Sequence, residues 1–430
     1  MIEPWLYTNY LPHINKNRFI FKFFNITMMS KLENGSIPWP IIGSATLLAF
    51  TMFIPEFSIP PMMHLIKEEL GLTHTQTSLF YTIPVLMIAI VAVPAGLVTD
   101  RIGIRKSAGI GAILISLGSI LRSTAADPSS LLAFTFIYGV GLGWVLPSLP
   151  KMVSGWASRD KAIVFTGIYS VGIYAGPALA LSLTIPIVFP ITNTIQGTFF
   201  IWSIPSVVAT ILWWALVKDP PHEDFAGNSM ISGRATLLHV IKNRSLWLLS
   251  LFNFLYAFFY YNWTGWAPAL LMQKGATASL AGLITSITLW VGIPTVFLIP
   301  RLSQRIGLRK PFLWLPAIIL AISSLSALYV DLSLSWILMV SVGIADSVLL
   351  ITVLTLPIEL TSHHKEVGVA SGLVFSIGHF GGLIGPLIGG RILDVTGTFY
   401  LSLIVLTCVA AVAVVIASRL PETGPGVLRK

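Results

Sequence analysis

Three ionisable side chains stand inside long apolar stretches of this sequence, where they could take up and release protons. They are Glu56, Asp346 and His379. A carboxyl group buried away from any cation binds its proton more tightly than usual, and ionisable groups inside membrane spans are costly enough to be functional candidates. Arg122 is expected near a span end, where it can reach the membrane surface. For all three candidates, a structural hydrogen bond competes with a role in proton or ligand binding.

Aromatic and polar side chains crowd one stretch in the second half of the chain and could bind a small polar molecule. Tyr260, Tyr261 and Asn262 are consecutive. They cannot all face lipid, because neighbours on a helix lie about 100° apart. At least one is therefore expected to face a cavity and hydrogen-bond a substrate. The first half of the chain supplies the other candidates. They are Lys151, to attract an anion at the cytoplasmic mouth, and four residues for the facing wall: Tyr138, Trp144, Tyr169 and Tyr174.

The composition places these residues in a membrane. Of 430 residues, 55% are hydrophobic and 10% are charged, against roughly 25% charged in soluble domains. Twelve apolar runs come near the roughly 20 residues that cross a bilayer, so we expect an all-α membrane protein with twelve transmembrane helices in two six-helix bundles. The expected organisation is a cytoplasmic tail (1–38), an N-terminal bundle (39–217), a cytoplasmic linker (218–245), a C-terminal bundle (246–418) and a second tail (419–430).

The distribution of basic residues predicts the orientation. With both ends of the chain inside, 22 of the 26 Lys and Arg residues fall on the cytoplasmic side, as the positive-inside rule requires. The net charge of +9 comes from these short clusters, and no arginine-rich groove indicates nucleic acid. We expect a cell-membrane protein with cytoplasmic termini. For the first 36 residues, an interfacial segment and a translation start at Met28 or Met29 are both open.

A basic hexapeptide is repeated at nearly half the chain length. Arg101 to Lys106 reads RIGIRK, and Arg305 to Lys310, 204 residues later, reads RIGLRK. Each copy directly follows a long apolar run. Internal repeats of this kind indicate two related halves, and many transporters hold their substrate between such halves.

The first copy is part of a longer motif. The sequence from Gly96 to Lys106, GLVTDRIGIRK, resembles the loop motif of the major facilitator superfamily between spans two and three. The resemblance implies that this loop gates the transporter by latching its halves together. The residues that carry the implied role are Gly96, Asp100, Arg101, Gly103, Arg105 and Lys106. In the second copy Pro300 and Gln304 replace the Gly and the Asp, so we expect the C-terminal latch to be weaker.

Glycine motifs occupy matching places in spans five and eleven. The first comprises Gly172, Gly176 and Pro177, and the second comprises Gly381, Gly385 and Pro386. Glycines four residues apart allow close helix packing, and a proline permits bending. The span-five motif also resembles the antiporter motif of drug–proton exchangers, but Ala180 and Leu181 stand where that motif has glycines. We therefore assign both motifs to helix packing.

Shorter segments resemble the cyanate porter branch of the superfamily, which includes nitroimidazole transporters. They are Val145 to Lys151 (VLPSLPK), Thr166 to Ser170 (TGIYS) and Leu354 to Pro357 (LTLP). The resemblance implies a secondary transporter for a small anion or a small polar organic compound. We expect alternating access around a midplane site and coupling to protons, which the buried carboxyl groups suit. The chain departs from the proton-coupled members in span four, where Thr135 stands in place of their arginine, four residues before Gly139.

Other classes of function stay open or are disfavoured. A drug/proton antiporter that exports amphipathic compounds is the main alternative, because the expected cavity is aromatic and poor in cations. A sensor on a transporter fold would need a partner. An enzyme is disfavoured because no metal-ligand cluster or nucleophile–base pair stands at mid-depth, and His363-His364 falls in a loop. We expect a monomer in the lipid bilayer with no metal, no cofactor and no nucleic acid, whose partners are the small-molecule substrate and protons.

Overall fold

The apolar runs of the sequence form long helices. The computed structural model describes residues 39–156, 159–219, 239–361 and 364–424, except the side chains of residues 100, 154, 155, 159–164, 364 and 365. Helices span membranes because every backbone group is satisfied within its own segment. Over these residues the structure contains helices and no strand. The predictions for the first 38 residues, for most of the linker and for His363 lie outside the described residues, whereas His364, which we expected in a loop, begins a helix.

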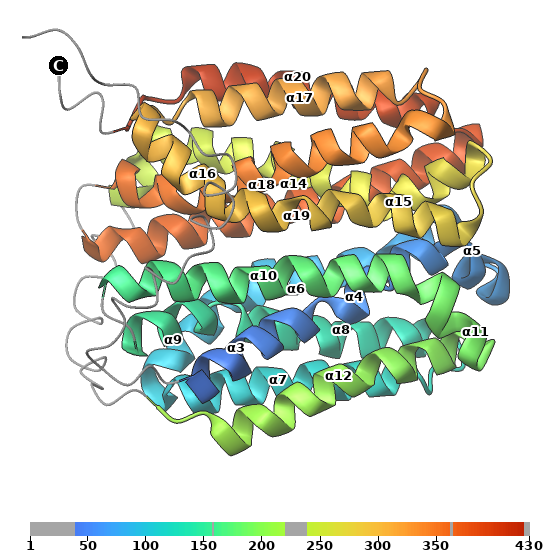
Figure 1. Cartoon of the computed structure of the whole chain (residues 1–430), viewed down its shortest axis with the longest axis horizontal. Coiled ribbons are helices and arrows are strands. Elements are labelled where there is room, and N and C mark those ends of the chain that lie inside the picture. Colours follow the sequence, from blue (N-terminus) through green and yellow to red (C-terminus); the bar gives the residue numbers. More distant parts are fainter. Residues whose placement is uncertain (1–38, 157–158, 220–238, 362–363, 425–430) are drawn as a thin grey trace, which may run out of the picture. The chain divides into compact units, whose positions relative to one another are not determined.

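The N-terminal half contains six spans (Figure 1). Span one is broken into α3 (Trp39–Met52), α4 (Ile54–Phe57) and α5 (Ile59–Leu70). Spans two and three are α6 (His74–Ile102) and α7 (Ile104–Arg122). Span four comprises α8 (Pro128–Val145) and α9 (Ser148–Trp156). Span five comprises α10 (Arg159–Leu183), the π-helix η1 (Thr184–Val188) and α11 (Phe189–Thr192), and span six is α12 (Ile195–Leu216).

The C-terminal half repeats this arrangement. Its spans are α14 (Arg244–Gln273), α15 (Ala278–Trp290) with α16 (Gly292–Ile306), and α17 (Pro311–Ser326). After the short 3-10 helix η3 (Leu332–Leu334) come α18 (Ser335–Leu360), α19 (His364–Thr396) and α20 (Tyr400–Arg419). Ten spans of the described chain are long and apolar enough to cross a membrane. The other two are α17, which is apolar but shorter, and α14, whose 30 residues include many Tyr, Trp and Asn side chains. The expected fold class is confirmed.

Prolines break span one, and other helices satisfy the backbone that the break exposes. Pro55 opens α4, and Pro60 and Pro61 lie in the first turn of α5. Proline lacks an N–H and leaves carbonyls without their helical donor. Pro55 removes the donor of Thr51 O, which accepts a hydrogen bond from Ser206 Oγ at 3.4 Å. Two carbonyls beside the break also have donors from other helices, Met52 O from the Tyr138 hydroxyl at 2.6 Å and Pro55 O from Arg122 Nη1 at 3.0 Å. Such side-chain donors make broken helices tolerable at membrane depth.

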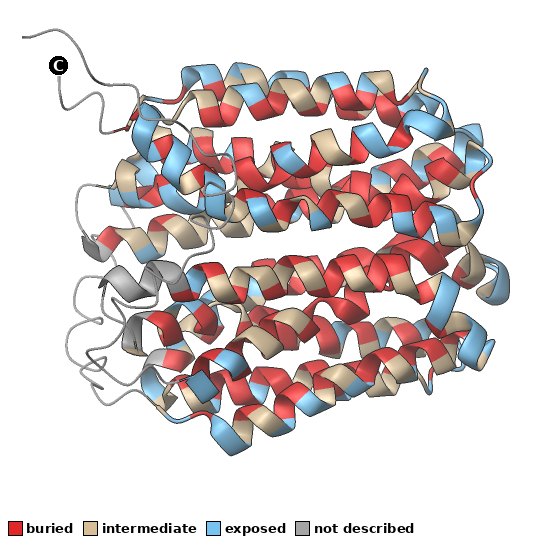
Figure 2. Cartoon of the chain, viewed as in Figure 1, coloured by how far each residue is buried: buried red, intermediate tan, exposed pale blue. Residues whose placement is uncertain are grey.

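The two halves meet along three main lines of helix contact. The helix α6 packs on α19, α10 packs on α15 and α16, and α5 packs on α14. Figure 2 shows buried positions along the helix sides that face other helices and exposed positions on the outer sides. From Pro40 onward the chain is one compact unit.

Small residues bring helices together within each half. Gly172 and Gly176 of α10 lie against the α3 backbone at Thr46 and Phe50, and Gly381 and Gly385 of α19 lie against the α14 backbone at Phe254 and Phe258. A Cβ at Gly176 or Gly385 would clash with a carbonyl of the neighbouring helix. The structure therefore places both glycine motifs where close packing demands a residue without a side chain.

In each half, an acidic residue that follows the sixth span caps the start of the third span. Asp219, just after α12, accepts a hydrogen bond from the backbone N–H of Arg105 at 2.7 Å. Glu422, just after α20, accepts one from the N–H of Arg309 at 2.5 Å and one from the N–H of Lys310 at 3.1 Å. In both halves an acid at the end of the sixth span thus stabilises the positive N-terminal end of the third span. The turns before these caps use Gly103 and Gly307, with φ of 87° and 72°, values that L side chains rarely adopt.

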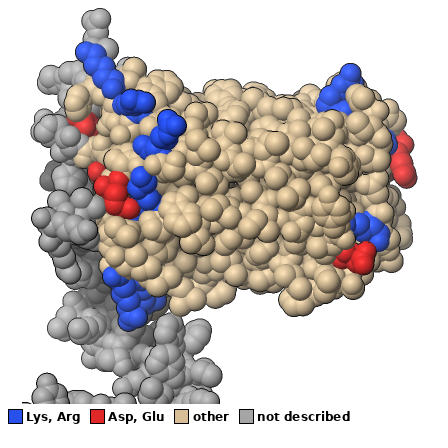
Figure 3. Space-filling view, turned by 90° about the horizontal axis from the view of Figure 1, so that it is seen from above, with Lys and Arg blue, Asp and Glu red and all other residues tan. Residues whose placement is uncertain are grey.

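An apolar belt separates the charged ends of the molecule. Figure 3 shows one face on which charged side chains gather at the two ends and an uncharged band lies between them. Large exposed side chains in this part of the chain include Ile113, Phe136, Ile211 and Leu298. A belt of this kind is what a hydrocarbon core requires.

Candidate functional site between the two halves

A cluster of tyrosines lies where the two halves meet. We call Tyr81 and Tyr174 of the N-terminal half and Tyr256, Tyr260 and Tyr261 of the C-terminal half the tyrosine cluster. The Tyr81 and Tyr261 rings are 5.8 Å apart, and the rings of Tyr260 and Tyr261 are 5.2 Å apart. The Tyr81 hydroxyl shares a hydrogen bond of 2.9 Å with Thr264 Oγ1 across the interface. The ring of Tyr174 lies directly against Gly292 of the opposite half.

Asp346 lies at the C-terminal side of this cluster. Its side chain is 2% exposed, and its Oδ1 accepts a hydrogen bond from the Tyr256 hydroxyl at 2.5 Å. Its Oδ2 has no hydrogen-bond partner. Tyr174 of the other half lies within electrostatic range of the same carboxylate, although its hydroxyl makes no hydrogen bond of acceptable geometry. Asp346 therefore faces the boundary between the halves.

Glu56 lies at the N-terminal side, on the short helix α4. It is 0% exposed, and neither carboxyl oxygen has a hydrogen-bond partner among the described residues. Tyr81 and Tyr261 lie within electrostatic range of it. A buried carboxyl group without hydrogen bonds is costly as an anion, so this position favours an acid that can be neutral.

A buried arginine accompanies Glu56, which corrects the expectation from the sequence. Arg122 is 1% exposed and does not reach the membrane surface. Its guanidinium lies 4.4 Å from the centre of the Phe199 ring and 5.5 Å from that of Tyr138. It is also the cation that acts electrostatically on Glu56. The expectation that Arg122 reaches the membrane surface is therefore wrong, because its Nη1 donates to Pro55 O at the break in span one and the cation thus lies beside Glu56.

The other residues proposed from span seven and span eleven take different positions. Tyr260 and Tyr261 belong to the tyrosine cluster. Asn262 is 2% exposed and donates to Gly385 O at 2.7 Å, so it ties α14 to α19. His379 Nδ1 is 2.7 Å from Phe375 O of its own helix. The geometry thus gives Asn262 and His379 backbone partners, and their roles in ligand or proton binding stay predictions.

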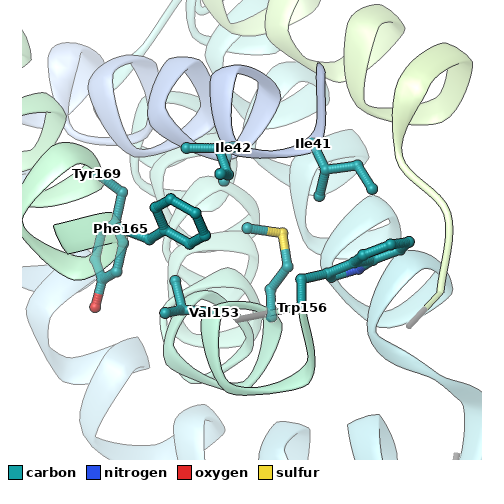
Figure 4. A pocket seen from close by; sticks show the side chains of 8 residues that line it. Ile41, Ile42, Val153, Trp156, Phe165 and Tyr169 are labelled. Atoms are coloured by element: carbon teal, nitrogen blue, oxygen red, sulfur yellow. The ribbon is translucent and has the colours of Figure 1, made fainter. Parts of the chain in front are cut away.

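Of the four residues expected in the facing wall of the first half, Tyr174 belongs to the tyrosine cluster, and Tyr138 lies within electrostatic range of Glu56 and Tyr261. Trp144 Nε1 donates to Ser107 Oγ at 3.0 Å, and Lys151 Nζ donates to Gly96 O at 2.7 Å. Tyr138 is buried beside Arg122 with its hydroxyl on Met52 O. Tyr169 lines an apolar cavity of about 10 Å³ with Phe165 and residues of α3 and α9, as Figure 4 shows. In this structure Tyr138, Trp144, Lys151 and Tyr169 do not join the cluster.

The gating motif makes its described contacts within the N-terminal half. Arg105 Nη2 donates to Trp214 O at 2.8 Å. Arg101 and Lys106 are exposed, and a Cβ at Gly96 would lie 4.0 Å from Pro147 and from Lys151, an ordinary contact that does not require a glycine. The side chain of Asp100 lies outside the described residues. The implied latch between the halves therefore stays a prediction.

The second copy of the motif makes its described contacts within the C-terminal half, so the expected weakness of a C-terminal latch stays a prediction. Arg309 binds Glu359 of α18 through two guanidinium nitrogens, with Nη2 at 2.7 Å and Nε at 2.9 Å from Oε1. Thr423 Oγ1 donates to the same carboxylate at 2.6 Å. Paired guanidinium donors of this kind are the geometry that arginine prefers with carboxylates. Arg309 thus binds within its own half although this copy lacks the Gly and the Asp.

Sequence reasoning missed a polar contact at the outer end of the interface, which we call the outer clamp. Asp394 of α19 accepts four hydrogen bonds from the first residues of α6. They come from His74 N (2.7 Å), His74 Nδ1 (2.8 Å), Thr75 N (3.0 Å) and Thr75 Oγ1 (2.6 Å). A carboxylate in the last turn of a helix opposes the helix dipole, so the position of Asp394 was a signal that it serves another helix.

The arrangement as a whole suits solute and proton movement better than metal chemistry. No group of three His, Cys, Asp or Glu side chains that could hold a metal ion occurs among the described residues. Two related helix bundles with a polar site where they meet are the architecture of many membrane transporters.

Comparison with known proteins gives the family. Residues 45–277 and 252–429 match the Major Facilitator Superfamily, and the chain belongs to this family. It is 22% identical over 360 residues to the 2-nitroimidazole transporter of Escherichia coli (strain K12), covering 84% of this chain and 89% of that protein. It is 20% identical over 347 residues to a cyanate transport protein of the same organism, covering 80% and 87%. The resemblance to this branch is confirmed at low identity.

A solved structure shows the same fold. A bacterial homologue of the human lysosomal transporter Spinster, in an inward-facing and occupied conformation, superposes with a TM-score of 0.71 and 18% identity. The match covers 90% of this chain and 98% of that one. The chain is thus a multi-pass membrane transporter of small solutes and not an enzyme.

Proposed function

We propose that this protein moves a small anion or small polar organic compound across the cell membrane together with protons. The observation that carries the proposal is the pair of buried carboxyl groups, Glu56 and Asp346, on either side of the tyrosine cluster. Glu56 binds the coupling proton, because its burial without a hydrogen bond makes the neutral form favourable. Asp346 positions Tyr256 and, through it, the substrate.

The chemistry of the cluster indicates the kind of substrate. Phenol rings offer flat apolar faces and hydroxyl groups that donate or accept one hydrogen bond. A small planar solute with polar edges fits such a wall. An anion would meet two carboxylates there, so it would enter with a proton that neutralises one of them. The relatives that transport 2-nitroimidazole and cyanate are consistent with this substrate class.

Alternating access requires a contact that opens and closes at each end of the interface. The outer clamp is such a contact, since Asp394 and the start of α6 belong to different halves. We propose that the clamp breaks when the site opens outward, while the motif at residues 96–106 acts at the inner end. Both termini are then cytoplasmic, and the transporter works as a monomer.

The gate is tested by cysteine accessibility. In a Cys408→Ser background, Ser78→Cys places a thiol at a fully buried position of α6 just beyond the clamp. Asp394→Asn removes the charge that holds the N-terminus of α6, and charge-assisted hydrogen bonds are worth about 1.5–3 kcal/mol each. We expect Asp394→Asn to raise external labelling of this thiol about tenfold. Asp331→Asn, an exposed outer carboxylate, is the matched control, and equal labelling in both variants would refute the clamp.

Transport itself is tested in proteoliposomes that contain a pH-sensitive dye. Small anions, neutral nitroheterocycles and lipophilic cations are added one at a time, and proton flux is recorded. Flux with anions or neutral compounds supports the proposal, provided that Glu56→Gln abolishes it. Flux with lipophilic cations alone would favour the second candidate, a drug/proton antiporter, for which two acids beside an aromatic cluster are also suitable.

A further inference from the structure

A second polar feature lies within the N-terminal half, away from the interface. A cavity of about 10 Å³ is present at its outer end. That volume corresponds to about one water molecule. Among the residues that line it are Glu69, Arg122, Asp127, Leu131, Gln196 and Phe199.

Arg122, which lines this cavity, has guanidinium N–H groups that lack a hydrogen-bond acceptor among the described residues. Arg122 uses Nη1 to bind Pro55 O, but its Nε and Nη2 have no hydrogen-bond partner in the described protein. Leaving charged donors unpaired in the interior costs several kcal/mol. A water molecule in the cavity would supply an acceptor, since Arg122 lines that space.

Arg122 also connects the cavity with Glu56. The carbonyl that it binds belongs to Pro55, the residue next to Glu56, and it acts electrostatically on the Glu56 carboxyl group. The other titratable groups that act on Glu56 are Tyr138 of α8, Tyr81 of α6 and Tyr261 of α14. Glu56 does not line the cavity itself, and Arg122 is the lining residue that also acts on Glu56.

The outer mouth of the cavity is polar. Gln196 Nε2 donates to Glu69 Oε1 at 3.0 Å in an exposed position. Asp127 caps α8 and accepts hydrogen bonds from the N–H groups of Ser129 and Ser130. The bonds from Ser130 contribute most to lowering the pKa of this carboxyl group. Two acids at the mouth and a volume near that of one water disfavour an anion as the occupant.

We propose that this cavity is a proton port, which leads from the outer surface past Arg122 to Glu56 through the interior of the N-terminal half. Water in the cavity takes up a proton from external water and releases another to a second water molecule beside the guanidinium group. That second water gives a proton to an oxygen of the Glu56 carboxylate, each water exchanges one O–H bond for another, and Arg122 keeps its own proton throughout. The inference rests on the proposed function, because it takes Glu56 as the proton-binding residue.

The port separates the path of the proton from that of the substrate. The outer clamp joins the halves at the outer end of the interface. The cavity, by contrast, is lined by residues of the N-terminal half only. Glu56 can therefore exchange protons with the outside while the clamp is closed.

Two cavities of equal volume allow a matched test. Ala125 lines the proposed port, and Ala45 lines the apolar cavity beside Tyr169. Ala125→Leu fills the first and Ala45→Leu fills the second with the same added groups. The full-length protein is placed in vesicles with a single orientation. An external pH jump then starts protonation of Glu56, followed by time-resolved infrared absorption of its carboxyl C=O.

We expect Ala125→Leu to slow this protonation at least about tenfold and Ala45→Leu to leave it unchanged. Leu131→Phe is a second plug of the same cavity, in case Ala125→Leu does not fold. Unchanged rates in a folded plug variant would overturn the port. If the unmodified protein shows no carboxyl signal that Glu56→Gln removes, the proton assignment to Glu56 fails, which is a different outcome.

Discussion

Glu56 and Asp346 are similarly buried in opposite halves, with exposed fractions of 0% and 2%, but their surroundings differ. Asp346 is held by the Tyr256 hydroxyl at 2.5 Å. Glu56 has no hydrogen bond, and its electrostatic partner is Arg122. A hydrogen bond to a carboxylate favours its charged form, whereas burial without one favours the neutral form. We therefore propose that the two acids differ in function, with Glu56 changing its protonation state during transport and Asp346 holding Tyr256 in position.

The largest expected effect separates the two acids directly. Glu56→Gln removes the proton-binding group, so we expect substrate-driven proton flux to fall about a hundredfold, or 2.7 kcal/mol. Asp346→Asn keeps an oxygen that can accept the Tyr256 hydroxyl, and we expect a loss of about threefold, below 1 kcal/mol. Proton flux into proteoliposomes measures both. Equal losses in the two variants would show that the acids share one role.

A smaller effect is expected when Asp346 is made to resemble Glu56. Tyr256→Phe removes the only hydrogen bond that the described residues give to the Asp346 side chain. An unsatisfied buried group costs about 1–3 kcal/mol, and this cost falls on the charged form. We expect a second titration to appear in the pH dependence of transport and to vanish in the double variant with Asp346→Asn. Tyr329→Phe, at a residue that is 77% exposed, serves as the control.

The smallest effect concerns the hydrogen bond between Tyr81 and Thr264, which joins the two halves between Glu56 and Asp346. Tyr81 and Thr264 share one hydrogen bond of 2.9 Å between the halves. Tyr81→Phe and Thr264→Val should each slow transport by a factor that corresponds to about 1 kcal/mol. Because they remove the same bond, the double variant should be no worse than either single one. Additive losses in transport rate would mean that Tyr81 acts on the acids by another route.

The sequence predicted the helices and their pairing into halves, because these follow from composition and from a repeat. Ten spans meet simple length and hydropathy limits, and the hexapeptide recurs after 204 residues. It also singled out Glu56 and Asp346 as ionisable residues within apolar runs, because that property depends only on neighbouring residues in the sequence. Tyr260 and Tyr261 were found for a similar reason, as consecutive tyrosines cannot all face lipid.

What the sequence could not predict depends on contacts between distant segments. Arg122 ends a helix of 19 residues, a position where arginine is favourable for the helix dipole and for the membrane surface. In its buried position it donates a hydrogen bond to the carbonyl of Pro55, which stands 67 residues earlier in the chain. The outer clamp joins residues 320 positions apart, and no local pattern pairs them. The places of Tyr138, Trp144 and Tyr169 in the proposed wall were inferred from residue type alone, and type does not determine which face of a helix turns toward the other half.

The two acidic caps have a consequence for how the protein is made. Asp219 follows the sixth span and binds the start of the third, and Glu422 does the same in the second half. Once the ribosome has synthesised residue 219, the N-terminal half already contains Asp219, the acid that caps the start of its third span. Each half can thus complete its internal contacts in the order of synthesis, and two separately translated halves should assemble into a working transporter.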